Sequence, residues 1–342
     1  LKWETVTRLS LGMDMSLWQN RLNLSFNYYK SFVDHMLTLK TLGGVSGLRN
    51  YWSNDGKMEN QGFDISVTAK VLALKDFSWE ISAGLGHYKN EVTALPDGDK
   101  PVYTSLYGGE VVTQVGGPVG LFYGYKTQGV FSTSEDAAFA GLRDGRADGD
   151  VFRGGDMHFA DLVADGVIDE KDKTVIGDPN PDIFGNFGTS LHYKNWTLNA
   201  FFSYSLGNDI YNYQRAVLEG GSTYYNQTTA VLNRWTSEGQ VTEIPRAELG
   251  DPMGNSRFSD RWIEDGSYLK LKTLSLSYRI PFNYTFLQGI TVWAAANNVF
   301  TCTKYLGSDP ELSISSSAVG QGIDRGLLGR GRSFVLGVKI NL

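Results

Sequence analysis

The chain has 342 residues, of which 41% are hydrophobic, with a formal net charge of −6 and an isoelectric point near 5.3. This acidic balance argues against a nucleic-acid partner, because a nucleic-acid binder should carry a basic patch. No segment reaches the ~18 consecutive apolar residues of a membrane helix, and Cys302 is the single cysteine of the sequence, so no internal disulfide can form.

Alternation of apolar and polar residues at period two predicts β-strands along most of the chain. Nine strands are expected, at about residues 5–17, 22–39, 63–71, 77–86, 183–193, 196–206, 273–280, 289–303 and 333–342. In the last of them Phe334, Leu336 and Val338 share one apolar face with Ile340 and Leu342. A strand with one dry and one wet face is typical of antiparallel sheets.

The connections between these strands alternate between short turns and long loops. Short turns follow the first, third, fifth and seventh strands, and the turn after the seventh covers Pro281–Gln288. Long loops are expected at about residues 41–57, 92–181, 208–258 and 304–330. Outer-membrane barrels have this organisation, with short turns in the periplasm and long loops outside the cell. The stretch Gly120–Phe131 is assigned to the second long loop.

The number of strands is odd, whereas bacterial barrels have an even number. The first and last strands would also run in the same direction, so they cannot pair antiparallel to close a ring. We therefore expect the N-terminal barrel strands to lie outside this chain or to be supplied by another chain, and the chain to end at the periplasmic side.

The distribution of charges favours a membrane sheet over a soluble one. Arg8, Lys70, Glu80 and Arg279 all fall on the polar faces of their strands, as required where a Lys or Arg facing lipid costs about 2–4 kcal/mol. Aromatic residues gather near the short turns, as in a membrane-interface girdle: Trp18, Phe77, Trp79, Tyr193, Trp196 and Tyr278. The predicted fold class is all-β, an antiparallel transmembrane β-barrel portion with long extracellular loops. The alternative is a large soluble sandwich or β-solenoid, although such proteins rarely carry loops of this length.

An ordered set of short motifs adds a family resemblance that covers nearly the whole chain. The motifs are Asn60–Asp64, Gly116–Gly120, Phe122–Tyr125, Gly129–Phe131, Asp165–Asp169, Ile176–Pro179, Asn233–Trp235, Asp265–Lys272, Asn297–Thr301 and Asp309–Glu311. Each is weak alone, but in this order they resemble the C-terminal part of the barrel of SusC/RagA-type TonB-dependent outer-membrane transporters.

The resemblance implies a larger plugged barrel of about 22 strands in the outer membrane of a Gram-negative bacterium. It also implies a SusD-like surface lipoprotein as partner, the TonB complex as energy source through the N-terminal part, and contact with outer-membrane lipid. The implied function is active import of oligosaccharides or peptides. Such barrels often end in Phe, whereas this chain ends in Leu342.

The acidic segment 161–172 has the spacing of a calcium-binding loop. Asp161, Asp165, Asp169 and Asp172 occupy the first, fifth, ninth and twelfth positions of an EF-hand-like pattern, with Gly166 at the sixth. Carboxylate oxygens at these positions suit Ca²⁺ or Mg²⁺. The pattern is incomplete, because its third position is Val163. A metal-free acidic turn is the alternative interpretation.

Aromatic residues are frequent in the predicted external loops. Amphipathic rings of this kind can stack on sugars, or contact peptides and a lid protein, and the alternative is that they pack the loops together. The candidates for ligand or lid contact are Tyr51, Trp52, Tyr123, Tyr125, Tyr211 and Tyr213.

The sequence offers no catalytic constellation. Its four histidines show no metal-ligand spacing, and no serine lies in a nucleophile-elbow motif. The protein is therefore not expected to be an enzyme, and an outer-membrane hydrolase has the least support. The main alternative to import is a structural or assembly barrel protein of the outer membrane that does not transport.

Overall fold

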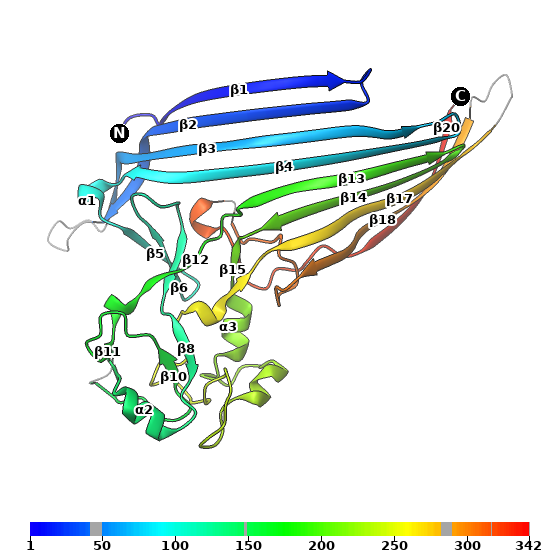
Figure 1. Cartoon of the computed structure of the whole chain (residues 1–342). Helices are drawn as coiled ribbons and strands as arrows, with labels where there is room; N and C mark the ends of the chain where they lie inside the picture. Colours follow the sequence, from blue (N-terminus) through cyan, green and yellow to red (C-terminus); the bar gives the residue numbers. More distant parts are fainter. Residues whose placement is uncertain (42–49, 147–148, 282–288, 316, 342) are drawn as a thin grey trace.

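Nine long strands form a single curved antiparallel sheet, which we call the wall sheet (Figure 1). The computed structural model describes residues 1–41, 50–146, 149–281, 289–315 and 317–341. In spatial order, the strands are β1 (Thr5–Leu17), β2 (Leu22–Thr41), β3 (Asn50–Ala73), β4 (Phe77–Ala94), β13 (Ile183–Tyr193), β14 (Trp196–Leu206), β17 (Tyr268–Ile280), β18 (Gly289–Thr303) and β20 (Ser333–Asn341).

The wall sheet confirms the nine strands expected from alternation, in the expected order. The stretch Gly120–Phe131 lies outside this sheet, also as expected. The strands next to the first long connection are longer than predicted, because β3 already begins at Asn50 and pairs there with the end of β2. The loop expected at 41–57 is therefore wrong for residues 50–57. Backbone pairing with β2 extends β3 through the polar segment Ser53–Asp55, where apolar alternation is lost.

The short turns and the C-terminal strand end lie together at one end of the wall sheet, and the long connections lie at the other (Figure 1). The first three short connections cover residues 18–21, 74–76 and 194–195. Residues 282–288 of the expected turn and 42–49 of the expected loop lie outside the described residues. In the described part of the chain, no helix combines the length and the apolar character needed to span a membrane.

One face of the wall sheet exposes a continuous apolar surface. In β20 the side chains of Phe334 and Leu336 are 82% and 84% exposed, and the same alternation runs through β1. Near the short turns the rings of Trp196 and Tyr278 lie 4.6 Å apart on neighbouring strands. The apolar face and its aromatic border have the positions expected from the sequence.

The long connections fold into a compact unit, which we call the loop assembly (described residues of 95–182, 207–267 and 304–332). Four small sheets organise it. They are built from β5 (Val102–Leu106), β6 (Gly109–Thr113), β7 (Leu121–Gly124) and β12 (Thr174–Gly177); β8 (Thr127–Val130) and β10 (Met157–Phe159); β9 (Arg143–Asp144) and β11 (Val167–Ile168); and β15 (Asp209–Asn212), β16 (Ile263–Asp265) and β19 (Ile323–Asp324). The third of these connections thus supplies β19, which pairs with β15 of the second.

Short helices complete the loop assembly. They are α1 (Pro96–Asp99), α2 (Ser134–Ala140) and α3 (Tyr213–Glu219), with 3-10 turns η2 (Glu170–Asp172), η3 (Thr229–Asn233), η4 (Asp260–Trp262) and η5 (Ala318–Gly320). Thr133 caps α2 by accepting a hydrogen bond from the Asp136 N–H, and Gly141 ends it in the left-handed conformation.

Two buried apolar clusters hold the loop assembly together. One surrounds Phe131, Phe152 and Phe159. The other surrounds Phe122 and Trp262, both fully buried. Burial of large side chains is the main favourable contribution to folding. The long connections therefore form a packed unit that can hold side chains in fixed positions at the end of the wall sheet opposite the short turns.

Candidate functional site

A charged cavity of about 330 Å³ opens among the small sheets of the loop assembly. Its lining brings together residues far apart in the sequence, including Glu110 of β6, Tyr123 of β7, Glu170 of η2 and Arg257. The volume lies at the lower end of the range of ~300–1,000 Å³ that is usual for small-ligand sites. We call it the charged cavity.

One side of the charged cavity has two guanidinium groups for a single carboxylate. Asp144 is fully buried behind the lining. It accepts hydrogen bonds from Nη2 of Arg146 at 2.7 Å and from Nη2 of Arg257 at 3.1 Å. Burial opposes the charge of Asp144, but the bonds from Arg146 and the charge of Arg257 outweigh it and hold its pKa below the ordinary value.

Arg257 is the more confined of the two cations. Its side chain is 6% exposed and lies over the rings of Phe159 and Tyr125, with Cζ 4.4 Å and 5.0 Å from the two centroids. Its Nη1 has no hydrogen-bond partner among the described residues. Burial, and then repulsion from Arg146, lowers the pKa of Arg257.

On the other side of the charged cavity, carboxylates outnumber cations. Nζ of Lys173 lies 3.0 Å from Glu110 and 2.6 Å from Glu170, so two carboxylates share one ammonium group. Burial opposes the charge of Lys173, but its hydrogen bonds to Glu170 and Glu110 prevail and raise its pKa. Lys173 also lies 5.7 Å from the centroid of the Tyr125 ring. Arg257 on one side of the charged cavity and Lys173 on the other thus both lie beside the ring of Tyr125.

Tyr123 and Tyr125, two of the predicted contact residues, both line the charged cavity. The rings of Tyr123 and Tyr103 lie 5.0 Å apart, and burial together with a hydrogen bond to Tyr103 raises the pKa of Tyr123 to about 12. Tyr125 is 4% exposed and also belongs to the first apolar cluster. The Tyr125 ring therefore packs in the apolar cluster and also forms part of the cavity lining.

An uncharged cavity of about 500 Å³ lies between the wall sheet and the loop assembly. Met58, Asn60 and Tyr88 contribute from wall strands, and Asn180 and Gln321 from the long connections. None of its described lining residues carries a formal charge. Its carboxamides and apolar side chains suit neutral ligand groups that combine hydrogen bonding with apolar contact.

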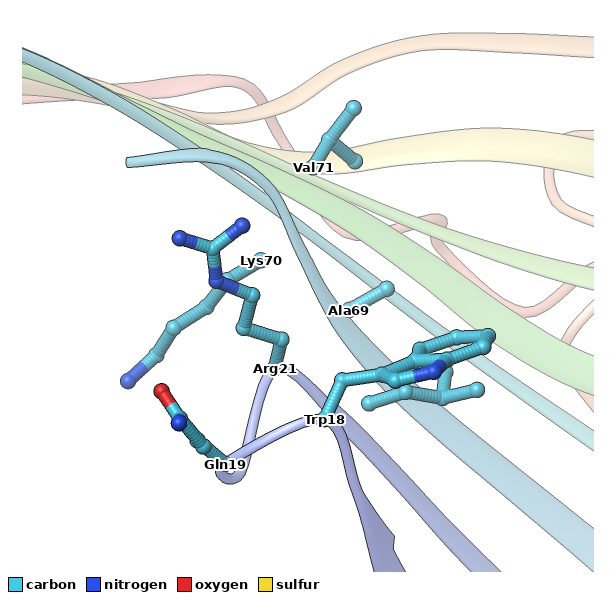
Figure 2. Close-up of a pocket in the computed structure, with 7 residues that line it drawn as sticks. Trp18, Gln19, Arg21, Ala69, Lys70 and Val71 are labelled. Atoms are coloured by element: carbon cyan, nitrogen blue, oxygen red, sulfur yellow. The ribbon is translucent and has the colours of Figure 1, made fainter. Parts of the chain in front are cut away.

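A third hollow lies at the opposite end of the molecule, beside the turn between β1 and β2. Figure 2 shows the side chains of Arg21, Lys70 and Gln19 on one side of this turn and the indole of Trp18 on the other, beside Ala69. The Lys70 N–H donates to the Arg21 carbonyl at 2.7 Å. The hollow is shallow and remote from the loop assembly, so we do not include it in the candidate site.

The structure separates the remaining aromatic candidates into different environments. Tyr51 and Trp52 lie in β3 and are 38% and 57% exposed, so they belong to the wall and not to a loop as expected. Tyr211 is 3% exposed in the second apolar cluster, and its hydroxyl donates to the Tyr107 carbonyl. This is the packing role that the sequence left open. Tyr213 begins α3 and lies against Tyr107. For all six aromatic candidates, including Tyr123 and Tyr125, a role in ligand or lid contact stays a prediction.

The acidic segment folds as a tight turn whose carboxylates accept backbone hydrogen bonds. Asp161 accepts from the N–H groups of Ala164 and Gly166, and Asp172 accepts from those of Leu162, Val163 and Asp169. Asp169 caps η2, and Asp165 accepts from the Val167 N–H. In the described chain, no group of three or more His, Cys, Asp or Glu side chains is arranged to hold an ion. A calcium site here stays a prediction.

Sequence reasoning missed the charged groups of the charged cavity. Glu110, Arg146, Lys173 and Arg257 come from four segments, and no local motif links them. The available signal was indirect: Tyr123 and Tyr125 were selected as aromatic candidates and lie in the same lining.

Comparisons with known proteins show that the chain is similar to TonB-dependent receptors. A scan against protein-family models found no match. The chain is 34% identical to the "TonB-dependent receptor P3" of Formosa agariphila over 99% of its own length and 34% of the relative's. It is 26% identical to the "TonB-dependent receptor SusC" of Bacteroides thetaiotaomicron over 99% of its length and 32% of that protein's.

Among solved structures, the chain matches one titled "Structure of the RagAB peptide transporter". The TM-score is 0.79 at 24% identity, covering 99% of this chain and 36% of the solved one. At this level of identity the match shows a shared fold. The chain spans about one third of the length of the relatives it matches. In sequence the chain is thus similar to about one third of the length of TonB-dependent receptors such as P3 and SusC, and it shares its fold with the RagAB transporter.

Proposed function

We propose that the intact protein imports nutrients actively across the outer membrane of a Gram-negative bacterium, using energy from the TonB complex. The observation that carries this proposal is the similarity to TonB-dependent receptors over 99% of the chain. The wall sheet, with an apolar exposed face and its long connections gathered at one end, is the architecture such a role requires.

The proposed cargo is an oligosaccharide or a peptide, held at the loop assembly before passage. The RagAB transporter, whose title names peptides, supports the peptide part of this range, and the oligosaccharide part rests on the resemblance drawn from the sequence motifs. Two cavities of different chemistry, one within the loop assembly and one between it and the wall sheet, provide places for such cargo. A SusD-like surface lipoprotein is proposed as the lid over this end, and the short-turn end with the C-terminus is proposed to face the periplasm.

The relatives are named as receptors, which supports a role in binding and import without catalysis. A structural or assembly role in the outer membrane is the alternative that the experiment below excludes or confirms.

The test is uptake by cells that lack the gene. Deletion should abolish uptake of at least one fluorescently labelled oligosaccharide or peptide fraction too large for porins. The full-length gene should restore uptake, and a protonophore should block it, because TonB-driven transport needs the proton gradient. A surface lipoprotein should co-purify with the full-length protein in mild detergent. The proposal is rejected if the deletion strain takes up every fraction at the wild-type rate and instead shows a general defect in its outer membrane.

A further inference from the structure

The two sides of the charged cavity carry opposite imbalances of charge within one small space. On one side Arg146 and Arg257 share Asp144. On the other side Glu110 and Glu170 share Lys173. Each cluster alone is one opposite charge short of neutrality, and the cavity between them is lined by groups of both clusters.

The positive side retains unused donor capacity after its internal contacts are counted. Nη1 of Arg257 has no hydrogen-bond partner among the described residues, although the side chain is only 6% exposed. Asp251 is the next carboxylate that acts on this guanidinium, but its oxygens accept bonds from Asn255 and Ser256. An unpaired buried donor is costly, so an incoming carboxylate would find a favourable place here.

The negative side retains acceptor capacity on carboxylates that water can also reach. The ammonium of Lys173 is shared between Glu110, whose side chain is 24% exposed, and Glu170, which is 77% exposed. Carboxylates that share one cation can still accept a second charged donor, since each oxygen pair offers about four acceptor positions. A ligand ammonium group would restore the balance.

From these two sides we infer that the charged cavity binds a small zwitterion, with its carboxylate at Arg146 and Arg257 and its ammonium group at Glu110 and Glu170. The chemical class is that of short unblocked peptides, which carry one charge of each sign at opposite ends. Tyr125 borders both sides, with Arg257 and Lys173 at 5.0 Å and 5.7 Å from its ring centroid. The ring of Tyr123, in the same lining, offers an apolar surface to the part of the ligand between the charges.

This inference names a cargo class for the proposed import and rests on that proposal only for its biological meaning, since binding itself requires no energy source. A neutral oligosaccharide would leave both imbalances in place. An acidic or basic ligand would correct one of them and repel the other side. Only a ligand with both charges complements the cavity as a whole.

The test is calorimetric titration of the full-length protein in detergent with dialanine and its two capped forms. Free dialanine carries both charges, N-acetyl-dialanine lacks the ammonium group, and dialanine amide lacks the carboxylate. We expect free dialanine to bind about tenfold or more tightly than either capped form, as charge-assisted hydrogen bonds predict. Equal affinity for all three, or no binding of free dialanine, would overturn the inference.

Two variants assign each charge to its side. Arg146→Gln should weaken free and N-acetylated dialanine but leave the affinity of the amide unchanged. Glu110→Gln should weaken free dialanine and the amide but leave the N-acetyl form unchanged. A variant that had merely lost its fold would lose affinity for all three. Arg332→Gln and Glu135→Gln, at exposed positions outside the cavity, are matched controls and should behave like the wild type.

The outcomes separate this inference from the proposed function. Binding of dialanine without any uptake defect in the deletion strain would keep the site and reject import. An uptake defect together with no preference for free dialanine would keep import and reject the zwitterion site. If the two variants show the same selectivity as their controls, the assignment of charges to these residues is wrong.

Discussion

Nζ of Lys270 lies 2.8 Å from Oδ2 of Asp309, and both side chains are nearly fully buried. Lys270 belongs to wall strand β17, and Asp309 to the long connection between β18 and β20. Glu311 of the same connection accepts from Lys270 at 2.7 Å and also pairs with Lys272. This network fastens part of the loop assembly to the wall sheet.

Replacing Lys270 should therefore release the connection that carries Asp309. Lys270→Met leaves a buried carboxylate without its cation, which costs about 3–5 kcal/mol. Hydrogen exchange of the folded full-length protein should show a loss of protection at residues 305–315, with the centre of β17 unchanged. Lys304→Met, at an exposed position of the same connection, is the control. Unchanged protection in Lys270→Met would show that the network does not fasten the connection.

Low pH should loosen the loop assembly through Asp144. The pKa of Asp144 is lowered from its ordinary value of 3.8, since the bonds from Arg146 and the charge of Arg257 outweigh burial. Its contribution to stability is present above the unfolded pKa and is lost as pH falls through the folded pKa, so the loss begins below about pH 4. Protease sensitivity of the loop assembly, measured between pH 6 and pH 3, should rise at the low end.

Asp144→Asn separates this residue from other titrating groups. The variant should be destabilised already at pH 6, because the buried guanidinium of Arg257 and the partly exposed one of Arg146 lose their shared carboxylate. Its remaining pH dependence should be shallower than that of the wild type. A variant as stable as the wild type at pH 6, with the same acid transition, would contradict this role.

We propose that Ca²⁺ binds the acidic segment 161–172 and makes it more rigid. In the structure the four aspartates hold backbone N–H groups, and Asp161 already accepts from Gly166 at the sixth position of the pattern. We expect Ca²⁺ to raise the thermal transition of the loop assembly and to slow proteolysis at residues 161–172, with Mg²⁺ less effective. The double variant Asp161→Asn, Asp165→Asn should lose the response, and Glu135→Gln should keep it. Identical proteolysis with and without Ca²⁺ would leave the segment as a metal-free turn.

The wall sheet could be predicted from the sequence because each strand is long and repeats its alternation many times. The bounds of β1, β13, β14 and β18 are those that alternation gave. The first residues of β3 were missed because the alternation fails there, while backbone pairing with β2 continues.

The interior of the loop assembly could not be predicted in the same way. β9 and β11 have two residues each and pair in parallel, so neither carries a periodic pattern. The charged cavity depends on Glu110 and Arg257, which tertiary packing alone brings into one lining. Aromatic richness identified Tyr123 and Tyr125, but it did not distinguish them from Tyr211, which lies in the core and does not line the charged cavity.

The orientation of the wall sheet is the central claim, because import requires the loop assembly to face the outside of the cell. It is tested by labelling intact cells with a membrane-impermeant maleimide, in a full-length variant with Cys302→Ser and no other reactive cysteine. Leu328→Cys lies in the long connection before β20 at a position that is 93% exposed, and Lys75→Cys lies in the short turn between β3 and β4. The account predicts that intact cells label Leu328→Cys and that Lys75→Cys reacts only after the outer membrane is permeabilised. The reverse pattern, or equal labelling of both positions in intact cells, would contradict it.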